Sequence, residues 1–243
     1  MQLMKSGARY LALDTETTGF EPSEGHRLVE IGLVEFMNGM VTGNVWHAYL
    51  DPERDMPEQA FAVHGLSEDF LSGKPLFRDV YREMLDFCAG AEIVIHNAGF
   101  DLKHLDAELD RIGEKPFTGR FPVKDSLQDA RRCYPGKPND LNSLCSRLGV
   151  DRSHRKLHGA LLDSELLAEV YMRMAGAHGL AHAFEVPEAA GTAKAVATEA
   201  AAAVDLKVRE RLGGGDPTPE ELERHAALVA KLKNPLWTVR EAA

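Results

Sequence analysis

The stretch LALDTETTGF, residues 11–20, is an apolar run that leads into two acidic residues, Asp14 and Glu16. The apolar side chains of residues 9–15 predict a buried strand, and Gly19 marks its end. Side chains two positions apart in a strand project from the same face, so both carboxylates point one way. Because buried carboxylates are costly unless a cation neutralises them, the stretch indicates a site for Mg²⁺ or Mn²⁺.

A hairpin signal follows this strand. Residues 28–37 and 40–50 alternate apolar and polar positions, and Asn38-Gly39 stands between them. Asn-Gly favours the two-residue turn that joins antiparallel strands. We therefore expect the first three strands to form an antiparallel meander.

Helices and strands alternate in the next part of the chain. The patterns predict helices over 76–89, from an Asn97 N-cap to Arg111, from an Asp140 N-cap to Gly149 and over 160–174, with short strands at 92–95 and in FPVKDS at 121–126. This order predicts an α/β fold with a mixed five-stranded sheet, in which parallel strands join the meander and helices flank the sheet.

Two more acidic residues lie where the predicted sheet ends. Asp101 is in the first turn of the helix after strand 92–95, and Asp163 is near the start of the last helix. Since strand ends and helix starts meet at one edge of a sheet, we expect all four carboxylates to converge. Their total charge of about −4 would be balanced by two divalent ions, a known arrangement for cleaving phosphodiesters.

His158 precedes Asp163 by five residues, across Gly159. An imidazole titrates near neutral pH and is able to take the proton of an attacking water, so His158 is the candidate general base. A lone histidine is more often a solvated loop residue, and a lone carboxylate is more often a surface charge or a helix cap. The combination of five such residues is what favours catalysis.

Composition narrows the class of protein. The 243 residues carry a net charge of −10, which argues against a broad basic surface for nucleic acid but not against an enzyme that holds one strand end through metal ions. The three cysteines form no paired motif, no stretch has the roughly 18 apolar residues of a membrane helix, and the first residues, MQLMKSG, lack the apolar core of a signal peptide. We expect a cytoplasmic protein without a membrane partner.

Three segments resemble the motifs of the DEDD exonuclease superfamily in its histidine branch, DEDDh. They are DTETTG at 14–19, NAGFD at 97–101 and HGALLD at 158–163, which has the spacing H-x4-D. The resemblance covers roughly residues 8–176 and is strongest to the proofreading subunits of bacterial replicative DNA polymerases. It implies a ribonuclease H-like fold and 3′→5′ removal of mononucleotides from a single-stranded or frayed DNA end.

The resemblance also implies a role for each residue of the candidate site. Asp14 would bridge two divalent ions, Mg²⁺ or Mn²⁺. Glu16 and Asp163 would complete one ion site, and Asp101 would hold the other. His158 would be the general base.

Substrate-binding roles fall on three further residues. Thr15 and Thr17, with their backbone groups, resemble positions that meet the terminal nucleotide. His64, in AFAVHGLS, is a candidate for contact with the substrate, although a packed histidine of a turn is an equal reading.

The chain changes in character after residue 176. We expect an exonuclease domain over 1–176, a linker over 177–204 and a polymerase-docking tail over 205–243. Residues 186–204 are rich in Ala, Thr and Glu and have too few large apolar side chains to pack, so we expect the linker to be mobile.

Two segments of this C-terminal part resemble docking sites. Proofreading subunits bind the sliding clamp through a short apolar motif that begins with glutamine. Residues 178–184 lack that glutamine, and Leu180 and Phe184 are the candidate anchors of a weak contact. The last residues, with the apolar pair Leu236 and Trp237, resemble the part that binds the catalytic subunit of the polymerase.

Two other functions are open on the sequence. A related DEDDh enzyme that trims RNA or short oligonucleotides would have the same catalytic residues but no need of a polymerase-docking tail. A mainly structural subunit of the polymerase assembly would act by tethering its partners, and its nuclease activity would be incidental.

Overall fold

The protein is described by a computed structural model that covers residues 4, 5, 7–153, 155 and 157–184, with side chains as far as residue 176. The chain divides into two units, Met1–Glu188 and Ala189–Ala243, and only the first contains described residues. Within the part of the chain that the structure covers, no helix is both long enough and apolar enough to cross a membrane.

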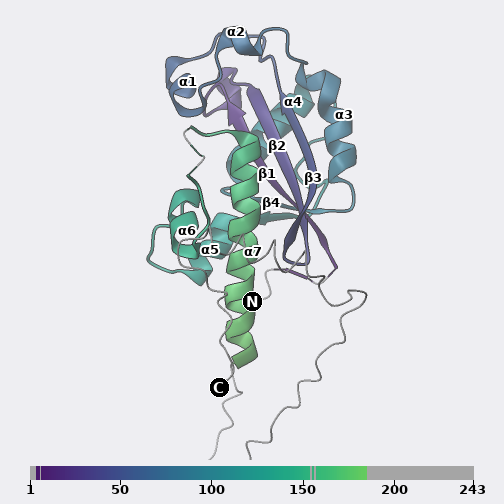
Figure 1. Ribbon diagram of the computed structural model, residues 1–243. Coiled ribbons are helices and arrows are strands. Elements are labelled where there is room, and N and C mark those ends of the chain that lie inside the picture. Colours follow the sequence, from purple (N-terminus) through teal and green to yellow (C-terminus); the bar gives the residue numbers. More distant parts are fainter. Residues whose placement is uncertain (1–3, 6, 154, 156, 185–243) are drawn as a thin grey trace, which may run out of the picture. The chain divides into compact units, whose positions relative to one another are not determined.

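A mixed five-stranded sheet forms the centre of the first unit (Figure 1). The strands are β1 (Arg9–Thr17), β2 (Leu28–Met37), β3 (Met40–Tyr49), β4 (Glu92–Ile95) and β5 (Val123–Asp125). They lie in the order β3-β2-β1-β4-β5, with β1, β2 and β3 antiparallel and β4 and β5 parallel to β1. The predicted fold, a meander extended by parallel strands, is confirmed.

The turn between β2 and β3 has the predicted hairpin geometry. Asn38 and Gly39 both have positive φ angles, 49° and 79°, as a type I′ turn requires. The Asn38 side chain also accepts a hydrogen bond from the backbone of Gly7, at 2.9 Å. The two residues therefore join the strands without strain on the sheet.

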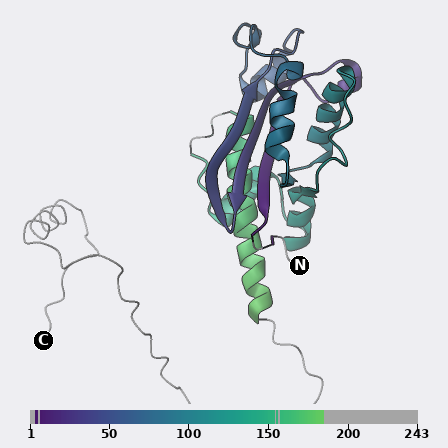
Figure 2. The same ribbon diagram turned by 90° about the vertical axis from the view of Figure 1, so that its right-hand side faces the viewer.

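Helices cover both faces of the sheet (Figure 2). One face packs against α3 (Phe77–Cys88) and α4 (Gly99–Arg111), and the other packs against α5 (Ser126–Cys133), α6 (Leu141–Leu148) and α7 (Ala160–Phe184). Alternation along β1 feeds both layers. Leu11 and Leu13 enter the α3–α4 layer, whereas Tyr10 and Ala12 enter the layer with α7.

Three short helices lie in the loops at one end of the sheet. They are the 3-10 helix η1 (Pro22–Glu24), α1 (Glu58–His64) and α2 (Glu68–Leu71). The first lies in the connection from β1 to β2, and the other two follow β3, at the end where β1 finishes.

Two predicted N-caps can be compared with the helices of the structure. Asp140 caps α6 as predicted, by accepting from the Ser143 N–H at 2.9 Å, and Gly149 ends it with φ 69°. The predicted Asn97 N-cap of α4 is wrong, because the N-cap is Ala98. Asn97 has φ 67° and makes the sharp turn out of β4, a conformation that asparagine tolerates, so it lies before the cap position.

The last predicted helix, 160–174, is longer in the structure. It continues as α7 to Phe184, so the backbone of residues 177–184 is helical where a linker was expected. Leu180 and Phe184 are on this helix, and their side chains are outside the described part. Leu236, Trp237 and the remainder of the linker and tail also lie outside the described residues. The division into 1–176, 177–204 and 205–243 stays a prediction.

Candidate active site

The polar side chains near the end of β1 alternate between the two faces of the sheet. Asp14 and Glu16 continue the series that begins with Tyr10 and Ala12, on the face covered by α7, and Thr15 continues the series on the face covered by α4. Glu16 is 8% exposed and Thr15 is 5% exposed. The predicted pair of carboxylates on one face of a buried strand is therefore present.

A glycine brings Asp163 to this face. A methyl group on Gly32 of β2 would lie 2.5 Å from the backbone of Ala160 and Leu161, so only a glycine allows α7 to begin this close to the sheet. The Ser164 hydroxyl donates to the Gly32 carbonyl at 2.9 Å and fixes the first turn of the helix. Gly32 is paired with Asp14 in the sheet. The first turn of α7 therefore places Asp163, which is 3% exposed, beside the carboxylates of β1.

Asp101 reaches the same place from the first turn of α4. It is 3% exposed, and its Oδ1 accepts a hydrogen bond from the Thr15 hydroxyl at 2.7 Å. Thr15, which lies between Asp14 and Glu16 on β1, thus orients the carboxylate of Asp101. The hydroxyl of Thr15 is engaged inside the protein, and its predicted contact with a terminal nucleotide stays a prediction.

His158 lies just before α7, at the open side of the carboxylates. Its Nδ1 is 3.3 Å from Oδ2 of Asp163, and its side chain is 48% exposed. Its backbone N–H donates to the Val63 carbonyl at 3.1 Å, which attaches this segment to α1. Glu16, His158 and Asp163 each present a ligand atom within 4.8 Å of the other two, so the structure brings these residues together as predicted.

The carboxylates repel one another in a place with little water. Burial, followed by the charges of Asp101, Glu16 and Asp163, raises the pKa of Asp14 well above its usual range. Burial and the charge of Asp163 raise the pKa of Glu16 to about 8. Burial also raises the pKa of Asp101 to about 7, although its hydrogen bond from Thr15 acts in the opposite direction.

Asp163 behaves differently from the other three. Burial would raise its pKa, but hydrogen bonds from His158 and Arg155, with their charges, outweigh burial and hold it below the ordinary value. No sequence pattern predicted a role for Arg155. The only signal was a cation three residues before His158 in RKLH, which is indistinguishable from a solvated loop residue.

These observations fit a divalent metal site. Three of the four carboxylates, Asp14, Glu16 and Asp101, are short of nearby positive charge, as their raised pKa values indicate. Carboxylate oxygens are the donors that Mg²⁺ and Mn²⁺ prefer. A cation among the carboxylates would offset both their mutual repulsion and the cost of burying their negative charges.

A hollow of about 510 Å³ opens beside Glu16. Its lining includes Thr17 and His64, two of the predicted substrate-binding residues, and two aromatic rings, Phe20 and Phe100. Phe20 is 74% exposed and meets Phe100 edge to face, with ring centroids 6.4 Å apart. The volume and the mixture of apolar walls with polar groups suit one nucleoside.

His64 is built into the wall of this hollow. It is 5% exposed, and its Nδ1 accepts from the Leu66 N–H at 3.0 Å, which places the proton of the neutral ring on Nε2. Burial lowers the pKa of His64, and the Thr17 backbone offsets this in part. The Nε2 atom is buried within this wall, and the Thr17 backbone is the polar group that faces His64.

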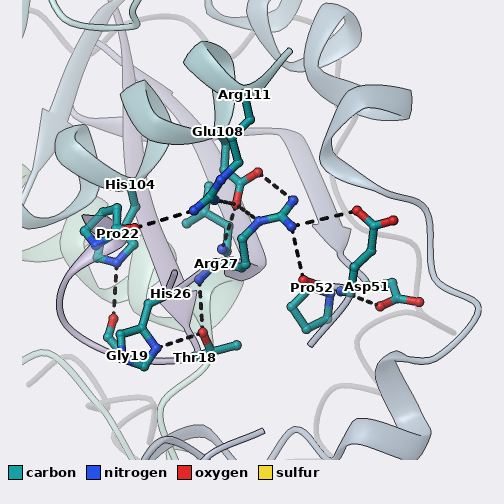
Figure 3. A network of polar contacts seen from close by, with 12 residues as sticks. Thr18, Gly19, Pro22, His26, Arg27, Asp51, Pro52, His104, Glu108 and Arg111 are labelled. Carbon is teal, nitrogen blue, oxygen red and sulfur yellow. Dashed lines mark hydrogen bonds and ion pairs between the residues drawn. The ribbon is translucent and has the colours of Figure 1, made fainter. Parts of the chain in front are cut away.

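A polar network holds the other wall of the hollow against α4 (Figure 3). Arg27 forms two hydrogen bonds with Glu108, at 2.6 and 2.9 Å, and Glu108 is 2% exposed. The two ring nitrogens of His104 lie 3.1 Å from the Gly19 carbonyl and 3.0 Å from the Phe100 carbonyl. The loop after β1 is thus fixed to the helix that carries Asp101. No local sequence pattern predicts this network, because the residues on its two sides are far apart in the chain.

Comparisons with known proteins agree with this geometry. Residues 11–171 match the family described as Exonuclease. The chain is 41% identical to DNA polymerase III subunit epsilon of Rickettsia prowazekii over 229 residues, which cover 93% of this chain and 98% of the relative. It is 48% identical to the same subunit of Escherichia coli K12 over 174 residues, which cover 69% of this chain and 72% of the relative.

Two solved structures share the fold. Exonuclease X in complex with 5′ overhanging duplex DNA has a TM-score of 0.57 and 25% identity, over 70% of this chain and 93% of that chain. The nuclease domain of 3′hExo, a DEDDh family member bound to rAMP, has a TM-score of 0.60 and 17% identity, over 71% of this chain and 95% of that chain. By its match to the family model and by its identity to relatives that it covers over 72% to 98% of their length, this chain belongs to the exonuclease family and, within it, to the DNA polymerase III epsilon subunits.

Proposed function

We propose that this chain is the proofreading 3′→5′ exonuclease subunit of a replicative DNA polymerase. It hydrolyses the last phosphodiester of a DNA strand and releases a mononucleotide. One observation carries the proposal: four acidic residues from three separate elements converge beside His158, next to a hollow of nucleoside size. Membership of the epsilon family supports the choice of DNA and of a polymerase assembly.

Two divalent ions, Mg²⁺ or Mn²⁺, are the cofactors that the carboxylates would hold. Such ions generate a hydroxide nucleophile at neutral pH and stabilise the leaving oxygen of a phosphodiester. Asp14 is central to the group, because its pKa responds to the charges of Asp101, Glu16 and Asp163 alike. We assign Asp14 to both ions, Glu16 and Asp163 to one of them, and Asp101 to the other.

His158 acts as the general base. Its ring is next to Asp163 and faces solvent on its other side, so it is able to accept a proton from a water and pass it to the bulk. The Val63 carbonyl holds its backbone, and the half-exposed ring contacts Asp163 and Arg155. These contacts position the imidazole at the open side of the carboxylates.

The hollow takes the terminal nucleoside. Phe20 and Phe100 offer ring faces and edges to a base, and base–aromatic stacking tolerates any sequence. The polar contacts with the sugar come from the Thr17 region and from the wall that His64 supports. Thr15 acts through Asp101, whose carboxylate it orients.

The C-terminal segment supplies the partner contacts in this proposal. Residues 205–243, with Leu236 and Trp237, dock on the DNA polymerase III catalytic (alpha) subunit, and residues 178–184, with Leu180 and Phe184, make a weak contact with the sliding clamp. The match to the Rickettsia subunit supports a tail of this kind, since it covers 93% of this chain. A role in replication assigns the protein to the cytoplasm.

The test combines metal, substrate and site variants. The full chain is incubated with a 3′-mismatched DNA primer while Mg²⁺ or Mn²⁺ is titrated, and mononucleotide release is followed. We expect metal-dependent release that Asp14→Asn and Asp163→Asn abolish. Asp110→Asn, an exposed aspartate on the helix that carries Asp101, is the matched control and should retain full activity. Activity that survives Asp14→Asn would refute the proposal.

The two alternatives make different predictions in the same assay. An RNA-trimming enzyme would cleave matched RNA and DNA ends at equal rates, and residues 205–243 would not retain the polymerase subunit. A structural subunit would support polymerase processivity equally well as wild type and as Asp14→Asn, whereas deletion of 205–243 would abolish it.

A further inference from the structure

One cation is buried among the carboxylates of the candidate active site. The Arg155 guanidinium engages both oxygens of Asp163, with Nε 2.5 Å from Oδ1 and Nη2 2.5 Å from Oδ2. The Arg155 side chain is 7% exposed and that of Asp163 is 4% exposed. Paired N–H···O bonds in a site that excludes water are the strongest form of this ion pair.

The guanidinium is also fixed on its remaining sides. Nη1 donates to Oδ1 of Asn142 in α6 at 2.7 Å, and Nη2 lies 2.8 Å from Nδ1 of His158. Arg155 therefore connects α6, the start of α7 and the candidate general base. These contacts hold it in one orientation, in contrast to an exposed arginine that only passes near a carboxylate.

This arrangement places two demands on one carboxylate. Asp163 belongs to the group of ligand atoms with Glu16 and His158 that lie within 4.8 Å of one another, and its Oδ2 is the oxygen that faces His158. Nη2 of Arg155 contacts this same oxygen. Because Arg155 contacts both oxygens of Asp163, a divalent cation that draws on this carboxylate must share an oxygen with the guanidinium or displace one of its contacts.

Resting on the metal-dependent function proposed above, we propose that Arg155 is a resident counter-cation of the metal site. It neutralises and orients Asp163 before metal binds, and it gives up the Nη2–Oδ2 contact to the metal. The contacts of Nε with Oδ1 and of Nη1 with Asn142 keep the side chain in place during this exchange. Arg155 is a positioning residue that lowers metal affinity while it stabilises the metal-free fold.

The test measures metal affinity and stability in the same variants. Mn²⁺ is titrated into the full chain by calorimetry, and urea unfolding is followed with and without saturating Mn²⁺. We expect Arg155→Gln to bind Mn²⁺ about tenfold more tightly, or ~1.4 kcal/mol, because a competing charge is gone. The variant should be less stable than wild type without metal, and Mn²⁺ should restore more stability to it than to wild type.

Arg9→Gln is the matched control, because Arg9 also forms an ion pair with a buried carboxylate, Glu35, which lies outside the cluster. It should lose the same stability with and without Mn²⁺ and keep the wild-type dissociation constant. Arg155→Lys, which retains the charge, should show a smaller gain in Mn²⁺ affinity than Arg155→Gln. It replaces Arg155→Gln in this test if the glutamine variant does not fold.

The outcomes separate this inference from the proposed function. If wild type and Asp14→Asn bind Mn²⁺ equally, the metal site itself is wrong. If wild type binds Mn²⁺ through Asp14 but Arg155→Gln binds it with the same or lower affinity, only the role of Arg155 is wrong. Equal loss of stability in Arg155→Gln with and without Mn²⁺ would reduce Arg155 to a structural ion pair.

Discussion

Gly32 in β2 and Ala160 at the start of α7 are in backbone contact, with no space for a side chain between them. This contact sets the separation between the strand that pairs with Asp14 and the helix that carries Asp163. Metal ligands tolerate errors of only a few tenths of an ångström. The spacing of the candidate site therefore depends on the absence of one methyl group.

Gly32→Ala should damage both stability and activity. The new Cβ would lie 2.5 Å from backbone atoms of Ala160 and Leu161, so α7 must move away from the sheet. We expect a loss of about 1–3 kcal/mol in urea unfolding and a large fall in nuclease rate. Gly176→Ala, on the same helix with nothing within 4 Å, should be neutral or stabilising. A Gly32→Ala variant with wild-type activity would contradict the role of this contact.

Thr15→Val should weaken metal binding without removing a ligand. Valine has nearly the same shape, but Asp101 loses the hydroxyl that donates to it at 2.7 Å. A hydrogen bond to a charged group contributes about 1.5–3 kcal/mol, so we expect roughly a ten- to hundredfold loss of Mn²⁺ affinity, measured by calorimetry. Thr42→Val, which removes a similar bond to Glu35 far from the site, is the control and should leave Mn²⁺ affinity unchanged.

His158→Ala should lower the rate of the chemical step with little effect on DNA binding. The imidazole lies next to Asp163 and takes no part in the core. Loss of a general base costs about 2–4 kcal/mol, or roughly 30- to 1000-fold in kcat. Single-turnover kinetics on a 3′-labelled primer measure the chemical step directly. If only KM changes, His158 binds substrate and another group is the base.

Phe20→Ala should raise KM for DNA ends more than it lowers kcat. Phe20 is 74% exposed, so its removal costs little stability, but it takes an aromatic wall from the hollow. Stacking on an aromatic side chain contributes about 1–3 kcal/mol per base. Met40→Ala, an exposed apolar residue of the hairpin, is the control and should behave as wild type. An unchanged KM would show that the terminal base binds elsewhere.

The stability of the metal-free protein should fall as pH rises from about 4.5 to 8. Glu16 has an ordinary pKa of 4.5 and a folded pKa of about 8, so within this window the folded state retains a proton that the unfolded chain has released. Asp101, raised to about 7, acts in the same direction. Urea unfolding in the presence of a chelator, at several pH values, measures the slope.

Saturating Mn²⁺ should flatten that slope, because a bound cation stabilises the ionised carboxylates. Glu16→Gln should also flatten it in part, even without metal. Stability that rises with pH across this window in the metal-free protein would mean that the carboxylates are not held close together.

The sequence predicted the parts of the fold that depend on local pattern. The apolar run of β1, the Asn38-Gly39 turn and the Asp140 cap each follow from a few neighbouring residues, and each is present. Asn97 failed as a cap because its polar side chain and its tolerance of positive φ serve equally for a turn, and only the path of the chain out of β4 decides between them.

The sequence predicts which residues gather at the candidate site, but it does not predict the contacts that support them. Four acids and His158 stand in short motifs, whereas the bond between Thr15 and Asp101 joins residues 86 positions apart. Arg155 is equally hidden, because a cation in a polar loop gives no sign that it will be buried against Asp163. Contacts of this kind arise from tertiary packing, which no local pattern encodes.

The helix that begins at the carboxylates also carries the chain away from them. Asp163 is in the first turn of α7, and Phe184, its last residue, is about 32 Å farther along the axis at a rise of ~1.5 Å per residue (Figure 1). A protein that binds α7 at its Phe184 end would therefore be held at this distance from the carboxylates. The length of the helix would keep such a partner clear of the entrance to the site.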